Sequence, residues 1–328
     1  MTDGARVLAV RNLEKRFWTR SGGMLASPQA VHAVSGVSFD LNAGECLGLV
    51  GESGCGKSTL ARCIVRLLEP SEGSVEFENH DITHLSQSAL RPTRRRLQIV
   101  FQSPYASLHP RMRVFDIIAE PLRNLGYARS EIGDRVAESL RRVQLEPDHA
   151  RRLPHEFSGG QRQRIGIARA LVCEPSLVVL DEPVSALDVS IQAGVLNLLK
   201  ELQETLGVAY LFIAHNLSVV RQLSERIAVM YLGKIVECGP RDQIYSDPQH
   251  PYTQALLSAA PIPDPLAERG RRRILLAGDI PSPMSPPSGC LFHTRCARAR
   301  ERCKIEAPHL TDKGDRHEVA CHHPGRCS

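Results

Sequence analysis

The sequence predicts an α/β protein, because strand-like and helix-like segments alternate through most of residues 1–245. One segment, Leu-Val-Val-Leu at 177–180, is continuously apolar and of strand length, which is typical of a parallel strand covered on both faces. A second feature is the glycine-rich turn at 51–59, which lies between an apolar run at 46–50 and a helix-like run at 60–68. These observations favour a core built around a parallel sheet.

The remaining elements follow from shorter patterns. Strand patterns lie at 7–10, 34–41, 73–77, 97–101 and 209–214, and 226–236 has the pattern of a hairpin. Helical spacing of apolar residues lies at 114–143, where Pro121 interrupts it, at 160–172 and at 191–206. Beyond residue 250, proline-rich stretches at 261–265 and 281–287 lead into a small module, about 278–328.

Composition places the chain among soluble globular proteins of about two domains. Of its 328 residues 42% are apolar and 23% charged, and a net charge of +5 is too small to indicate a nucleic-acid partner. No run of 18 apolar residues occurs, and residues 1–6 lack the pattern of a secretion signal, so we expect a cytosolic location. There, the ten cysteines are expected to bind metal or to be inert, and five of them lie in the last 39 residues.

The glycine-rich turn fits the phosphate-loop pattern G-x-x-x-x-G-K-[ST]. Its residues are Gly51, Glu52, Ser53, Gly54, Cys55, Gly56, Lys57, Ser58 and Thr59. A strand, a glycine turn and a helix together direct backbone N–H groups and a helix dipole at one point, where a triphosphate fits. Lys57 would reach the β- and γ-phosphates, and the Ser58 hydroxyl would ligate Mg²⁺. The alternative is a chance glycine turn, but the flanking strand and helix favour the phosphate loop.

Two carboxylates end the apolar strand at 177–180. Asp181 is suited to hold Mg²⁺ at the carboxyl end of a parallel strand, and Glu182, which points differently, to orient or deprotonate an attacking water. A simple helix cap after the strand is the alternative, and the phosphate loop favours catalysis.

A second potential anion site begins the helix near residue 160. Ser158, Gly159, Gly160 and Gln161 offer a hydroxyl and bare N–H groups to an anion. One nucleotide does not need two such sites, so this one is expected to serve the nucleotide of another subunit. A serine cap with a glycine hinge is the alternative, and it leaves the two glycines unexplained.

The order and spacing of these motifs resemble those of ABC ATPases over about residues 7–240. The resemblance implies a RecA-like core with a helical subdomain inserted at about 103–160. It also implies that Gln102 senses the metal and the attacking water and that residues 185–188 contact the partner subunit. His215 is expected to contact the γ-phosphate. Phe17 is expected to stack on the adenine, although the neighbouring Trp18 could do so instead. Asn216 stands at the position after His215 where ABC ATPases usually have aspartate. Two subunits would stack head-to-tail around ATP and Mg²⁺ and pass their motion to separate membrane subunits, with 103–110 as the contact.

Residues 250–257, together with the cysteine module, are similar to the ATP-binding subunits of dipeptide and oligopeptide importers, a group that includes nickel, glutathione and opine systems. The segments 18–31 and 99–104 are most similar to the dipeptide F-type subunit. This resemblance implies an ATPase domain at 1–248 and a C-terminal domain at 249–328. It implies a second, different ATPase chain, two permease subunits, a periplasmic solute-binding protein and a place on the cytoplasmic face of the bacterial inner membrane.

The C-terminal cysteines Cys290, Cys296, Cys303 and Cys321 are separated by five, six and seventeen residues. These spacings contain no tight zinc-type pair and match no common ferredoxin pattern. The resemblance implies that the four thiolates hold a [4Fe–4S] cluster, while zinc and unpaired structural cysteines remain alternatives.

Two other functions are open. One is a non-transport ABC ATPase. DNA-repair members of this kind carry a long coiled coil between the phosphate loop and the segment 158–161, where this sequence has only a compact stretch. Ribosome-associated members carry two cassettes in one chain, where this sequence has one. A redox- or iron-sensing ATPase that uses the C-terminal module is the other.

Overall fold

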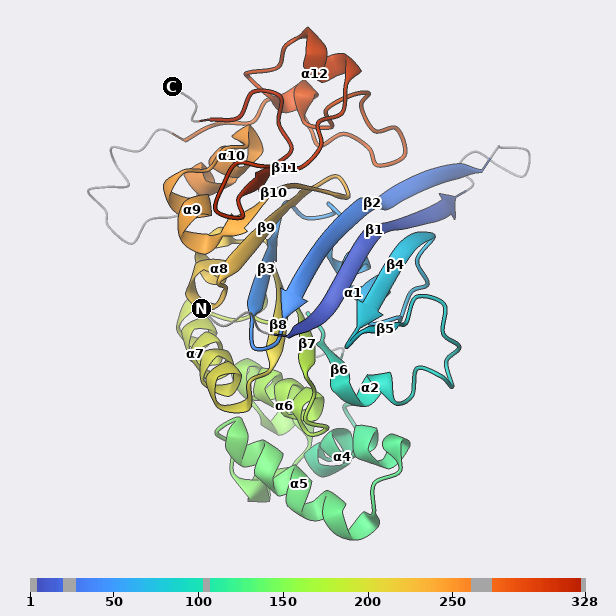
Figure 1. Cartoon of the computed structure of the whole chain (residues 1–328). Coiled ribbons are helices and arrows are strands. Elements are labelled where there is room, and N and C mark those ends of the chain that lie inside the picture. Colours follow the sequence, from blue (N-terminus) through green and yellow to red (C-terminus); the bar gives the residue numbers. More distant parts are fainter. Residues whose placement is uncertain (1–4, 20–27, 103–106, 261–272, 326–328) are drawn as a thin grey trace. The chain divides into compact units, whose positions relative to one another are not determined.

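The computed structural model describes residues 5–19, 28–102, 107–260 and 273–325 (Figure 1). The chain folds into two compact units, and it passes between them several times. The first unit contains Met1–Leu8, Asp40–Cys46 and Phe77–Ile213, and the second contains Ala9–Phe39, Leu47–Glu76 and Ala214–Ser328. The predicted boundary at residue 248 and the helical subdomain at 103–160 remain predictions.

The first unit contains a parallel sheet in the order β8-β7-β6. Its strands are β6 (Leu97–Val100), β7 (Leu177–Asp181) and β8 (Ala209–Ala214). In register, Leu177 of β7 pairs with Leu97 of β6 and with Ala209 of β8. Every residue of β7 and β8 is buried, which agrees with a parallel strand covered on both faces at 177–180. The short strand β5 (His80–Asp81) belongs to the same unit.

Helices form the rest of the first unit, and α4, α5 and α6 lie together (Figure 1). They are α2 (Thr93–Arg96), α4 (Val114–Leu125), α5 (Arg129–Arg142), η1 (Pro147–Arg151), η2 (Pro154–Glu156), α6 (Gly159–Leu171) and α7 (Val189–Leu206). The interruption predicted at Pro121 does not occur, because α4 continues through it to Leu125. The proline removes one backbone donor, but the apolar face of α4, with Val114, Ile118 and Leu122 fully buried, holds the helix in place.

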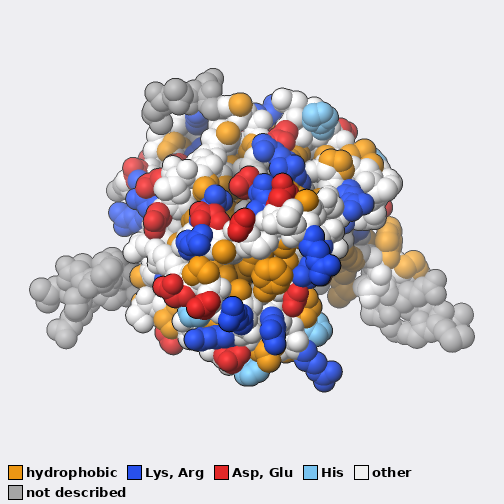
Figure 2. Space-filling model, turned by 90° about the horizontal axis from the view of Figure 1, so that it is seen from below, with side chains coloured by type: hydrophobic (Ala, Val, Ile, Leu, Met, Phe, Trp, Pro, Cys, Tyr) orange, Lys and Arg blue, Asp and Glu red, His pale blue; other side chains and the backbone are white. Residues whose placement is uncertain are grey.

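The exposed side of α5 carries both signs of charge. Arg135 and Arg142 each lie near Glu174, and Arg141 and Arg142 each pair with Glu138. Figure 2, which views the chain from the side of these helices, shows basic and acidic side chains interspersed.

The second unit contains a sheet in the order β11-β12-β10-β9-β3. Its strands are β3 (Cys46–Val50), β9 (Arg226–Tyr231), β10 (Lys234–Pro240), β11 (Thr311–Asp312) and β12 (Glu318–Val319). β3 runs parallel to β9, while β9 and β10 form the predicted antiparallel hairpin. β10 also pairs with β12, so a segment far along the chain extends this sheet.

A second sheet places β1 (Arg6–Thr19) between β2 (Gln29–Asn42) and β4 (Glu72–Phe77). β1 and β2 are longer than the strands predicted at 7–10 and 34–41. The apolar pattern covers the continuously buried part of β1, Val7–Val10, whereas residues 11–19 of β1 are mostly half-buried and charged or polar, apart from the buried Leu13 and two exposed aromatic residues. Hydrophobic periodicity therefore found the strands but not their full length.

The helices of the second unit are short: α1 (Lys57–Ile64), α8 (Leu217–Leu223), α9 (Arg241–Ser246), α10 (Pro251–Ala259), η3 (His293–Arg295) and α12 (Glu301–Ile305). α1 ends four residues before the predicted end at 68, and Arg66 adopts a left-handed backbone with φ of 56°. Among the described residues, no helix combines the length and apolarity needed to cross a bilayer.

Candidate nucleotide site

The phosphate loop lies between β3 and α1, as predicted. Lys57 is the first residue of α1, and its side chain is only 4% exposed. Its Nζ donates to the carbonyl oxygens of Gly51 at 2.8 Å and Glu52 at 3.0 Å, so the ammonium group lies inside the loop. Gly56 has a φ of 105°, and a Cβ there would lie 2.0 Å from the Ala33 carbonyl oxygen, so only glycine fits. The loop therefore gathers a lysine and the N-terminus of a helix at one place, as phosphate binding requires.

Cys55 contributes an inert thiol to this loop. The side chain is 4% exposed, and its Sγ lies 3.8 Å from Lys57 Nζ. Burial raises the pKa of the thiol, although nearby Lys57 acts in the opposite direction. A protonated, buried thiol is a poor nucleophile, which agrees with the expectation that cysteines outside a metal site are inert.

The end of β7 brings two of the predicted catalytic residues together. Nε2 of Gln102 donates to Oε2 of Glu182 at 2.9 Å. Glu182 has a left-handed backbone with φ of 49°, and its N–H donates to the Ile213 carbonyl oxygen at 3.0 Å. Asp181 precedes it inside the strand and is 2% exposed. The change of backbone direction gives the two carboxylates different surroundings, one buried and one beside Gln102.

His215 and Asn216 follow β8. His215 is exposed, as expected for a residue placed to reach a ligand rather than packed in the core. Asn216 begins α8, and its Oδ1 accepts the N–H of Ser218 at 2.8 Å. Asparagine caps helices as well as aspartate does, so the departure from the usual aspartate keeps the capping role.

The segment 158–161 begins α6 with a capping box. Ser158 Oγ accepts the N–H of Gln161 at 3.3 Å, and Gln161 Oε1 accepts the N–H of Ser158 at 3.0 Å. A Cβ on Gly160 would lie 2.4 Å from Cγ2 of Ile191 in α7, whereas one on Gly159 would make only ordinary contact at 3.4 Å. The structure thus supplies a packing reason for Gly160, which the alternative of a serine cap with a glycine hinge had left unexplained.

Two aromatic side chains near the end of β1 are exposed. Phe17 is 38% exposed and Trp18 is 70% exposed, and Lys15 Nζ lies 5.2 Å from the centre of the Phe17 ring. Neither ring is buried in the core, so both stay available for stacking on a ligand.

The four C-terminal cysteines line one small cavity of about 20 Å³ in the second unit, which His250, Phe292 and His293 also line. Burial raises the pKa of Cys290 to about 11, and the thiols of the other three cysteines raise it as well. Among the residues that the structure describes, no three metal-ligating side chains are arranged around a single ion. None of the nine described cysteines forms a disulfide, and Cys327 lies outside the described residues.

Two family models match the chain. The one described as "ABC transporter" covers residues 34–185, and the one described as "Oligopeptide/dipeptide transporter, C-terminal region" covers 236–303. The oligopeptide transport ATP-binding protein AppF of Bacillus subtilis is 52% identical over 96% of this chain and 97% of its own. OppF of Haemophilus influenzae is also 52% identical, over 96% of each chain, and DppF of Pseudomonas aeruginosa is 49% identical over 97% of each.

The chain belongs to the oligopeptide and dipeptide family of ABC transporter ATP-binding proteins. This ABC protein also resembles solved structures. CbiO1 of Clostridium perfringens, described as part of the ABC transporter complex cbiONQ, has a TM-score of 0.63 and 28% identity over 74% of this chain and 91% of its own. The dimeric cassette MJ0796, bound to ADP and Pi, has the same TM-score and identity over 71% of this chain and 98% of its own. The predicted α/β fold of an ABC ATPase is confirmed.

The ABC protein also holds its phosphate loop with residues that sequence reasoning missed. The N–H of Glu52 donates to Oη of Tyr252 at 2.8 Å, and the Glu52 carboxylate pairs with Arg295. Both partners lie far along the chain: Tyr252 belongs to the run 250–257, and Arg295 directly precedes Cys296 of the cysteine cluster. No local pattern indicated that either side chain would reach the loop.

Proposed function

We propose that this chain hydrolyses ATP to energise the import of peptides through a membrane ABC transporter. The observation that carries the proposal is its 52% identity, over nearly its whole length, to a protein named for oligopeptide transport. The match of residues 236–303 to the C-terminal region of such transporters supports the same substrate class.

We assign the chemistry to the residues of the candidate site. Lys57 and the loop amides bind the phosphates, and Ser58, Gln102 and Asp181 hold Mg²⁺. Glu182 activates the attacking water, Gln102 orients Glu182 through their hydrogen bond, and His215 contacts the γ-phosphate. Phe17 stacks on the adenine.

The serine and glycines at 158–160 serve the ATP of a second ATPase subunit. In the capping box Ser158 Oγ only accepts the N–H of Gln161, so its hydroxyl hydrogen would be able to donate to a phosphate oxygen when two subunits close. Closure around two ATP molecules, and reopening after hydrolysis, is the motion passed to two permease subunits, which receive peptide from a periplasmic binding protein. We therefore propose that the chain works on the cytoplasmic face of the inner membrane.

The decisive variant is Glu182→Gln. The amide keeps the size of the side chain and can still accept the Gln102 hydrogen bond, but it is no base. We expect ATP binding and ATP-dependent pairing of subunits to persist while turnover falls by at least about 100-fold. Glu204→Gln, an exposed change on α7, is the matched control. Wild-type turnover in Glu182→Gln contradicts the catalytic assignment.

Peptide uptake tests the transport assignment separately. Cells lacking this chain should lose ATP-dependent uptake of a labelled tripeptide, and the wild type should restore it where Glu182→Gln does not. Unchanged peptide uptake in the deletion strain, with ATPase activity intact in the purified chain, would exclude the peptide class and leave the ATPase assignment standing.

We further propose that Cys290, Cys296, Cys303 and Cys321 hold a [4Fe–4S] cluster. Four thiols on one cavity are a suitable donor set. A cluster would bind each of the four thiolates through a different iron. When bound, such a cluster supplies one-electron redox chemistry or a covalent tie between the segments that carry the cysteines.

Iron analysis checks this assignment. Cys296→Ser should remove iron and the visible absorption of anaerobically purified protein, whereas Cys173→Ala, at the end of α6, should remove neither. ATP binding should persist in both variants. Unchanged iron content in Cys296→Ser rules out the ligand role, and stoichiometric zinc in the wild type rules out the cluster.

A further inference from the structure

Glu52, the second residue of the phosphate loop, is held at two points by the C-terminal part of the second unit. Its N–H donates to Oη of Tyr252 at 2.8 Å. Its carboxylate pairs with both terminal nitrogens of Arg295, Nη1 to Oε2 at 2.8 Å and Nη2 to Oε1 at 3.2 Å. This paired geometry is the strongest that arginine makes with a carboxylate.

The ion pair is shielded from water. The side chain of Arg295 is 8% exposed and that of Glu52 is 25% exposed. The hydrogen bond to Glu52 is the main reason why the pKa of Arg295 is raised, so the guanidinium stays charged. It also lies 6.0 Å from the centre of the Tyr231 ring. An exposed ion pair would contribute little to stability. A shielded pair joined by two hydrogen bonds fixes the positions of both side chains.

An aromatic cluster fixes the two groups that hold Glu52. The rings of Tyr231, Tyr252 and Phe292 are almost fully buried, and their centres lie 4.7 to 5.4 Å apart. Tyr252 belongs to α10, and Phe292 directly precedes η3, which ends at Arg295. The cluster therefore joins both contacts in one packed body.

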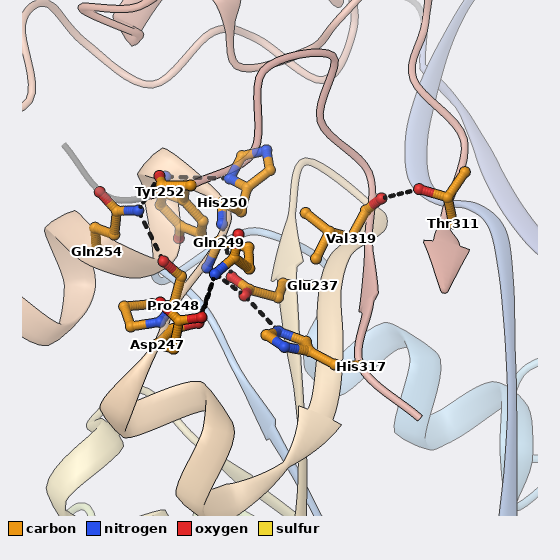
Figure 3. A network of polar contacts seen from close by, with 11 residues as sticks. Glu237, Asp247, Pro248, Gln249, His250, Tyr252, Gln254, Thr311, His317 and Val319 are labelled. Carbon is orange, nitrogen blue, oxygen red and sulfur yellow. Dashed lines mark hydrogen bonds and ion pairs between the residues drawn. The ribbon is translucent and has the colours of Figure 1, made fainter. Parts of the chain in front are cut away.

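A buried carboxylate anchors α10 in turn (Figure 3). Glu237 of β10 is fully buried, and it accepts the N–H groups of Gln249 at 2.7 Å and His250 at 3.0 Å. Its Oε1 also lies 2.8 Å from Nε2 of His317. The start of α10, and with it Tyr252, is thus tied to the sheet rather than to a flexible loop.

The position of Glu52 affects the residue proposed to bind the phosphates. The carbonyl oxygen of Glu52 accepts a hydrogen bond from Lys57 Nζ at 3.0 Å. Its N–H is held by Tyr252, so the peptide groups on both sides of Glu52 are oriented by contacts. A shift of Glu52 would move one of the acceptors that hold the lysine ammonium.

We propose that Arg295 and Tyr252 are positioning residues that clamp the phosphate loop in the shape that binds nucleotide. The proposal rests on the proposed function, since it takes Gly51–Thr59 as the ATP site. The clamp makes ATP affinity depend on the C-terminal region, in which Arg295 directly precedes Cys296 of the four-thiol cavity.

Equilibrium binding of ATP to the full-length chain tests the clamp, with KM and kcat measured in parallel. Arg295→Met and Tyr252→Phe should each raise the Kd and KM for ATP about tenfold and change kcat by less than about twofold. Arg302→Met, which breaks the exposed pair with Glu306 in the same region, is the matched control and should leave the Kd unchanged. The charge swap Glu52→Arg with Arg295→Glu should recover part of the lost affinity.

Three outcomes decide the matter. A lowered unfolding temperature with unchanged Kd in both variants would make these residues merely structural and overturn the proposal. If Arg295→Met fails to fold, Tyr252→Phe decides, because it keeps the buried ring and removes only the hydroxyl. Lys57→Ala distinguishes a failure of the nucleotide-site assignment from a failure of the clamp. Normal ATP binding in Lys57→Ala would refute the nucleotide site. Loss of ATP binding in Lys57→Ala, with normal ATP binding in Arg295→Met and Tyr252→Phe, would refute the clamp alone.

Discussion

Acidification should destabilise this protein through one buried histidine, His250. Burial lowers the pKa of His250 to about 4 from 6.5, and the nearby Glu237 carboxylate offsets only part of this effect. Its neutral Nδ1 accepts the N–H of Tyr252 at 3.1 Å and so caps α10. Because the folded pKa lies below the unfolded one, the unfolded chain binds the extra proton between about pH 6.5 and pH 4. Stability is therefore complete above this window and falls as the pH falls through it.

The size of the loss follows from the two pKa values. Between about pH 7.5 and pH 5, this single site should lower the free energy of unfolding by about 2 kcal/mol. Urea unfolding followed by circular dichroism at both pH values measures it. His250→Asn is the matched variant, since asparagine keeps a capping oxygen but does not titrate.

The difference between wild type and variant isolates His250 from every other acid-sensitive group. We expect His250→Asn to lose about 2 kcal/mol less than the wild type over this range. A second control, His309→Asn, removes an exposed histidine and should follow the wild type. Equal losses in the wild type and His250→Asn would refute the argument that burial keeps this histidine neutral.

Two further predictions concern the nucleotide site. Lys57→Ala should lower ATP affinity by at least about tenfold in equilibrium binding, because it removes the buried ammonium and leaves the carbonyls of Gly51 and Glu52 without their donor; unchanged affinity would contradict its role. Gly160→Ala should lower the unfolding temperature by overpacking against Ile191, and adding Ile191→Ala should restore stability but not ATPase activity. Recovery of ATPase activity in that double variant would mean that Gly160 serves packing only.

Local patterns predicted the parts of the fold that local physics determines. The apolar runs at 177–180 and 209–214 are buried strands, and the glycine turn at 51–59 connects a strand and a helix. Both features depend on residues within one element or on elements whose order the α/β pattern already indicates. The role of Gln102, which pairs with Glu182, came from the resemblance and not from a local pattern.

Contacts between distant segments could not be predicted in this way. Arg295 and Glu52 are separated by 243 positions, and no periodicity links them. The packing of Gly160 against Ile191 depends on how closely α6 approaches α7. Pro121 stays helical because neighbouring helices bury the apolar face of α4, which overrides a local penalty. In each case tertiary packing decided the outcome, and the sequence contains that information only indirectly.

The strained backbone of Glu182 is held in place by two contacts, and this residue is the proposed catalytic base. A left-handed conformation is unfavourable for glutamate and persists where other contacts hold it. Here the N–H is held by Ile213 and the side chain by Gln102. Gln102 directly precedes the segment expected to begin the helical subdomain. On this geometry, the orientation of the proposed base depends on Gln102.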